Sequence, residues 1–129
     1  GVLLRAAIAA KQDGDESRSA AWTNELADRF EAIRRRGDLP HGRYESRFYL
    51  DLRSDPPRAL ELAEENWAQQ KEYRDTRNLL EAALAAGSPD GAQAAVEFLR
   101  NTGNEDVRLQ ALSRQVVAAV EKSEAKDAG

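Results

Sequence analysis

The clearest sign of architecture in this chain is the sequence SDPPRALELAEENWAQQ, residues 54–70. Asp55 can accept hydrogen bonds from the free amides at the start of a helix, and Pro56 suits the first turn, where its missing amide costs nothing. Apolar residues from Leu60 to Trp67 then recur every three or four positions, which places them on one helical face. This stretch therefore predicts a capped, amphipathic helix.

The same devices recur on either side of it. Gly87-Ser88-Pro89 repeats the order of helix stop, N-cap and proline, and Gly37 stands where a helix C-terminus favours a positive φ. Asn104 is expected to cap the last helix. The sequence thus predicts seven helices, over about 2–12, 15–36, 42–53, 56–70, 75–86, 89–101 and 105–121, followed by a frayed tail over 122–129.

The composition favours the same fold class. The 129 residues include 23 Ala and 14 Leu but only 6 Val, 2 Ile and 3 Thr, so helix formers dominate and β-branched residues are scarce. Apolar residues make up 41% and charged residues 33%, which is typical of a globular chain. We predict a single all-α domain over residues 1–129 with no strand of four or more residues. No apolar run approaches the roughly 18 residues that a membrane span requires.

The start of the chain suggests a piece of something longer. The sequence has no methionine and opens on Gly1-Val2-Leu3-Leu4, already inside an apolar helical pattern. We therefore expect a fragment of a longer protein, from which the cellular compartment is not readable.

Residue counts limit the chemistry. The chain has no cysteine and one histidine, His41, so thiolate chemistry and metal sites of several imidazoles are excluded within one chain. A formal charge of −4 disfavours nucleic-acid binding. Gly87–Gly91 lacks the ending of a phosphate-binding loop. We expect no metal and no cofactor.

Other conspicuous clusters have plain structural explanations. The three arginines at 34–36 could contact phosphate, but they lie at a helix C-terminus, where cations are favourable. The carboxylates between Glu61 and Glu65 are expected to face solvent. Trp22 and Trp67 lie on apolar stripes, so both are expected in the core.

Three turns share a motif that points to a repeat. The motif reads GDESRS at 14–19, SDPPRA at 54–59 and GSPDGA at 87–92. In each, a small residue follows five positions after the first, which lets the two helices of a hairpin approach closely. These turns resemble those of the tetratricopeptide repeat (TPR) family. The resemblance covers about residues 2–101 and implies a TPR-like α-solenoid of three antiparallel hairpins, at about 2–36, 41–71 and 75–101.

The helix over 105–121 is expected to cap this stack. An open end of a solenoid must be covered by an element with a polar outer face. Leu109, Leu112, Val116 and Val120 would form its inner stripe. Val117 lies at the edge of that stripe, where it could support a homodimer contact. In the same arrangement, Trp67 and Leu99 are expected to be buried between neighbouring hairpins.

The resemblance also implies a function. Stacked hairpins expose a groove lined by the first helix of each pair, so we expect a non-catalytic scaffold module that binds a protein or peptide. The candidate groove residues are Tyr44, Phe48, Asp51, Arg74, Arg77, Asn78 and Glu81.

Other interpretations stay open at this stage. Tyr44 and Phe48 could simply be buried, and Arg77 could merely pair with Glu81 one helical turn away. The chain could instead be a structural or regulatory domain of a longer enzyme, or an all-α enzyme with a site near His41.

Overall fold

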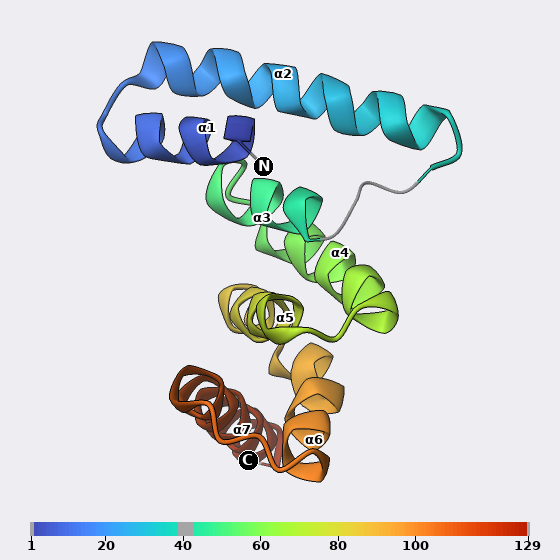
Figure 1. The fold of residues 1–129 in the computed structure, drawn as a ribbon. Helices are drawn as coiled ribbons and strands as arrows, with labels where there is room; N and C mark the ends of the chain where they lie inside the picture. Colours follow the sequence, from blue (N-terminus) through green and yellow to red (C-terminus); the bar gives the residue numbers. More distant parts are fainter. Residues whose placement is uncertain (1, 39–42, 129) are drawn as a thin grey trace.

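The computed structural model describes residues 2–38 and 43–128 of the chain, and this part is helical without any strand, as predicted. The elements, shown in Figure 1, are α1 (Val2–Gln12), α2 (Glu16–Arg35), α3 (Tyr44–Asp51), α4 (Pro56–Gln69), α5 (Tyr73–Ala85), the 3₁₀ helix η1 (Pro89–Ala92), α6 (Gln93–Asn101) and α7 (Val107–Ala128).

The helices are stacked in the order of the chain. Figure 1 shows the α1–α2 pair at one end, α3 and α4 next, then α5, and the α6–α7 pair at the other end. Helix α1 packs against α2, α3 against α4, α4 against α5, and α5 against α7. Contacts are therefore made mainly between elements that are close in sequence.

Helix starts follow the capping chemistry of the sequence. Asp15 and Asp55 accept hydrogen bonds from the backbone amides three residues later, at 3.1 and 3.3 Å. Helix α5 begins at Tyr73, two residues before the predicted start. The reason is a capping box, in which Glu72 and Asp75 each accept a hydrogen bond from the other's backbone amide.

The C-terminal third differs from the prediction in three details. The Ser88 side chain makes no capping hydrogen bond, and a 3₁₀ turn precedes α6. Asn104 accepts a hydrogen bond from the amide of Asp106 at 2.8 Å, and the Asp106 carboxylate accepts one from the amide of Leu109 at 2.9 Å. Asp106 is therefore the cap of α7. Helix α7 also extends beyond its predicted end at about residue 121, because it continues to Ala128.

The three motif turns share a backbone conformation. Gly14, Ser54 and Gly87, the first residue of each motif, have φ values of +79°, +50° and +65°. This left-handed region is costly for Ser54, the one of the three with a Cβ. The small residue five positions later is buried in every case: Ser19, Ala59 and Ala92.

Apolar residues gather in two clusters along the stack. One cluster joins α1, α2 and α3 through Leu4, Leu26 and Phe48. The larger one joins α4 to α7 and includes Trp67, 8% exposed, and Leu99, 2% exposed, so the predicted burial of both is confirmed. Trp22 is only half-buried and packs against the first cluster.

The inner stripe of α7 belongs to the larger cluster. Leu109, Leu112 and Val116 are buried there, while Val117 and Val120 are partly buried against it. The stripe and the edge position of Val117 are as predicted. Helix α7 thus covers α5, η1 and α6 at this end of the stack.

Candidate functional site

A groove of about 330 Å³ lies between α3 and α5, and its walls are polar. We call it the arginine groove. Its lining residues are Arg43, Arg47, Arg74, Arg77, Asn78 and Glu81.

Helical spacing brings these side chains together. On α5, Arg74, Arg77 and Glu81 are three and four residues apart, so they share one face of the helix. Arg43 and Arg47 are likewise four residues apart, at the start of α3. The groove forms where these two faces meet.

One carboxylate lies at the centre of the groove. Glu81 accepts hydrogen bonds from Arg77 Nε at 2.6 Å and from Arg47 Nη1 at 2.9 Å. A third guanidinium, that of Arg108 on α7, lies 3.7 Å from Glu81 Oε1. Burial raises the pKa of Glu81, but the hydrogen bonds from Arg77 and Arg47 outweigh it, so this pKa lies below its ordinary value. The hydrogen bond to Glu81 raises the pKa of Arg77 in turn.

A buried polar layer holds Arg47 in place. Its Nε and Nη2 donate to the two carboxylate oxygens of Asp51 at 3.1 and 2.9 Å, and its Nη1 donates to Asn78 Oδ1 at 3.4 Å. Asn78 Nδ2 donates to Ser46 Oγ at 3.0 Å, and Ser46 Oγ donates to the Ala59 carbonyl at 2.7 Å. The guanidinium of Arg47 is therefore held by contacts with both walls of the groove.

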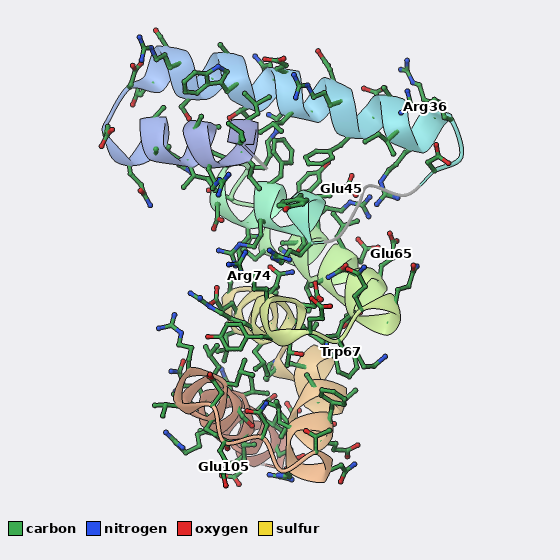
Figure 2. All side chains as sticks on the ribbon, in the orientation of Figure 1. Arg36, Glu45, Glu65, Trp67, Arg74 and Glu105 are labelled. Atoms are coloured by element: carbon green, nitrogen blue, oxygen red, sulfur yellow. The ribbon has the colours of Figure 1, made fainter. Side chains whose placement is uncertain are left out.

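Two arginines of the groove, Arg43 and Arg74, lie at the end away from Glu81 and are less tightly paired with carboxylates than Arg47 and Arg77 are. The nearest carboxylate to Arg43 is that of Asp75, 3.9 Å away, and its guanidinium also lies 5.5 Å from the ring centre of Tyr44. Arg74, labelled in Figure 2, is exposed. Within the described part of the chain, no carboxylate lies within 4.0 Å of it. Positive charge is thus left over at this end.

Most of the predicted groove residues lie in or beside the arginine groove. Arg74, Arg77, Asn78 and Glu81 all line the arginine groove, and Asp51 is joined to it through Arg47.

The two predicted aromatic residues do not line this groove. Tyr44 is partly exposed beside Arg43. The assignment of Phe48 to the binding surface is wrong, because it is only 1% exposed and packs edge-on against Phe30 and Tyr49, with ring centres 5.3 and 5.1 Å away.

Sequence reasoning missed the α3 wall. Arg43 and Arg47 were not among the candidates, although both line the groove. The signal was available, since Arg43, Arg47 and Asp51 follow at intervals of four and so share a helical face.

The arginine run at 34–36 is mostly structural. Arg34 Nε lies 2.9 Å from both carboxylate oxygens of Glu45, which is 5% exposed, and Arg34 Nη2 lies 3.3 Å from Glu65. The hydrogen bond to Glu45 raises the pKa of Arg34. Glu45 belongs to α3 and Glu65 to α4, and both are labelled in Figure 2. Arg34 therefore ties α2 to both helices, whereas Arg36 is exposed. Glu65 takes part in this tie, which the expectation of a purely solvated face did not include.

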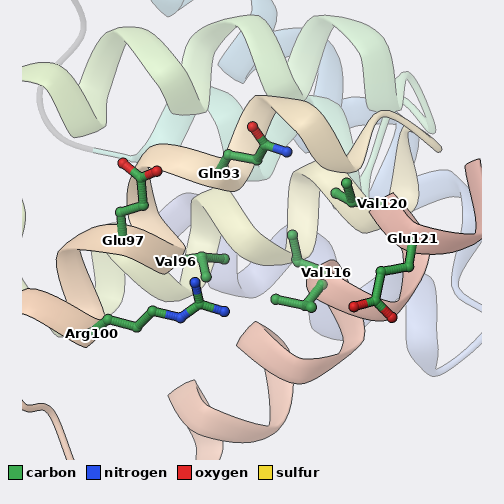
Figure 3. A pocket seen from close by; sticks show the side chains of 8 residues that line it. Gln93, Val96, Glu97, Arg100, Val116, Val120 and Glu121 are labelled. Carbon is green, nitrogen blue, oxygen red and sulfur yellow. The ribbon is translucent and has the colours of Figure 1, made fainter. Parts of the chain in front are cut away.

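A second groove, of about 270 Å³, lies between α6 and α7. Figure 3 shows Val96, Val116 and Val120 together with the polar side chains of Arg100 and Glu121. Val117 also lines this groove. The homodimer contact suggested for Val117 stays a prediction.

Further observations concern metal, membrane and family. Among residues 2–38 and 43–128, no three His, Asp or Glu side chains are grouped so that they could hold a metal ion. No helix in the same two ranges is long and apolar enough to cross a membrane. His41 lies outside the described residues, and so does any site around it. Comparisons with family models, curated proteins and solved structures found no match.

Proposed function

We propose that this chain is a non-catalytic module that binds a protein or peptide in the arginine groove. The observation that carries this proposal is the groove itself, in which side chains from α3 and α5 are held around one shared carboxylate. Binding sites that are fixed in advance lose less entropy when the ligand arrives. The charged groups also lie at a surface hollow, where a partner's side chains can reach them.

The proposed architecture is a TPR-like solenoid, and two observations support it. The three aligned turns share a left-handed first residue and a buried small residue five positions later. Alternate helices also touch, since α1 contacts α3, α3 contacts α5 and α5 contacts α7. In a solenoid of hairpins, these first helices line the binding surface. The arginine groove lies between two of them.

The test is a selection of random peptides displayed on phage against the intact chain, followed by amide NMR mapping of the peptides recovered. We expect the largest shifts in α3 and α5, and weaker binding in Arg77→Ala. Arg100→Ala, an exposed arginine on α6, is the matched control and should bind like the parent chain. The proposal fails if no peptide is recovered, or if the recovered peptides bind Arg77→Ala unchanged and shift other helices.

A further inference from the structure

We infer that the arginine groove selects an extended acidic peptide segment, one that carries Asp or Glu at alternate positions. This inference rests on the proposed function and adds the chemical class of the partner. It follows from the charge of the groove, from the way that charge is shared, and from the length of the groove.

The groove is positive in a chain that is negative overall. Five arginines line or border it, against three carboxylates, whereas the whole chain carries a formal charge of −4. The five are Arg43, Arg47, Arg74, Arg77 and Arg108. Local positive charge of this kind attracts an anionic segment, while the remaining surface repels it. An acidic ligand is thereby directed to this groove.

The internal ion pairs leave binding capacity. Arg47 already holds Asp51 through two parallel hydrogen bonds. Within the described residues, Arg77 and Arg108 have only the carboxylate of Glu81, which they share with Arg47, although each guanidinium can hold a carboxylate of its own. Arg74 has no such partner within the described residues. Incoming carboxylates can therefore bind guanidinium groups that the fold has only partly satisfied.

The length of the groove matches an extended strand. Arg74 and Glu81 are seven residues apart on α5, which corresponds to about 10 Å along the helix axis. Alternate side chains of an extended peptide lie about 6.6 Å apart on the same side. Two acidic side chains at positions i and i+2 fit within this length, one near Arg74 and the other near the guanidinium of Arg77, which reaches towards Glu81.

The same features argue against a nucleic acid. Single-stranded nucleic acids are held by basic grooves in which aromatic rings stack on the bases. None of the six lining residues is aromatic, and the two tyrosines at the edge of the groove, Tyr44 beside Arg43 and Tyr73 beside Arg77, do not line it. The carboxylate of Glu81, at the centre of the groove, would also repel the phosphate groups of a nucleic acid.

The experiment measures fluorescence anisotropy of a labelled octapeptide of alternating Glu and Ala, beside its Gln counterpart and an RNA octamer. Four proteins are compared: the parent chain, Arg74→Glu, Glu81→Gln and the control Arg100→Glu. We expect the Glu peptide to bind more tightly than the Gln peptide and to weaken as salt is raised. Arg74→Glu should weaken it by roughly tenfold, and Arg100→Glu should leave it unchanged. Glu81→Gln should strengthen it by a few-fold, because Arg77 and Arg108 lose the carboxylate that they share.

The opposite signs at positions 74 and 81 make the test specific, and thermal melts of each variant check that it is folded. Equal binding of the Glu and Gln peptides at the groove would overturn the acidic preference while leaving the proposed function standing. RNA bound more tightly than the Glu peptide through Arg74 would also overturn it. The proposed function itself would be wrong if substitutions in the groove changed the binding of neither these peptides nor the phage-selected ones.

Discussion

Replacing Trp67 by alanine should lower the free energy of unfolding by about 3–5 kcal/mol. The indole is buried between helices, with its ring edge-on to Phe98 at 5.6 Å between centres and its Nε1 donating to Thr76 Oγ1 at 3.1 Å. The aromatic pair contributes about 0.5–1.5 kcal/mol and the hydrogen bond about 1 kcal/mol. Lys71 Nζ lies 4.7 Å from the ring centre at an exposed site and adds about 0.5 kcal/mol. Loss of apolar burial and the cavity left behind supply the rest.

Urea denaturation followed by far-UV circular dichroism measures this change, and a thermal melt should show a drop of roughly 4 °C per kcal/mol. Trp67→Phe is the control, because it keeps an aromatic ring and loses the indole donor, so it should cost about 1–2 kcal/mol. Trp22 remains in both variants as a fluorescence reporter of the α1–α3 cluster. A loss below about 1 kcal/mol in Trp67→Ala would refute the view that this side chain holds α4 to α5 and α6.

Three further changes probe other parts of the stack. Arg34→Met leaves the buried Glu45 carboxylate without its ion-pair partner, so it should lower the free energy of unfolding by about 3 kcal/mol in urea denaturation. Adding Glu45→Leu should recover most of that loss. Equal losses in the single and double variants would contradict this. The pKa of Glu81 lies below its ordinary value, so its contribution to stability is present at neutral pH and is lost as the pH falls through about 4 and below. Glu81→Gln should therefore flatten the dependence of the melting temperature on pH between about 5 and 3, and an unaltered slope would count against it. Deleting residues 105–129 uncovers the larger apolar cluster and should lower the melting temperature and cause association in analytical ultracentrifugation, whereas an unchanged, monomeric protein would show that α7 is not a cap.

Much of the fold could be predicted because its signals are local. Asp15 and Asp55 lie next to the helices that they cap, and each apolar stripe lies within one helix. The misses came from choices that local patterns leave open. Asp106 competes with Asn104 for the α7 cap, and the capping box of Glu72 and Asp75 uses a residue that is less common at an N-cap.

The site was harder to predict because its geometry depends on residues far apart in sequence. Periodicity placed Arg77 and Glu81 on one face of α5. It gave no indication that Arg47, which is 34 positions before Glu81, would share the same carboxylate. The assignment of Phe48 to the binding surface was wrong for the same reason. Its ring is covered by Phe30 of α2, and local sequence does not indicate which helix packs over α3.

The serial order of the helices has a mechanical consequence. Helix α1 lies in the layer at one end of the stack, and helix α7 lies in the layer at the other end (Figure 1). Tension applied between the two ends of the stack is therefore transmitted through each layer in turn. The two apolar clusters bear the same force one after the other, because they lie in successive parts of the stack. Such an arrangement extends stepwise, because each layer is held mainly by its neighbours and the weakest one yields first. Separation at the polar layer between α3 and α5 would pull the walls of the arginine groove apart, so the proposed binding of an acidic peptide would weaken as the molecule is stretched.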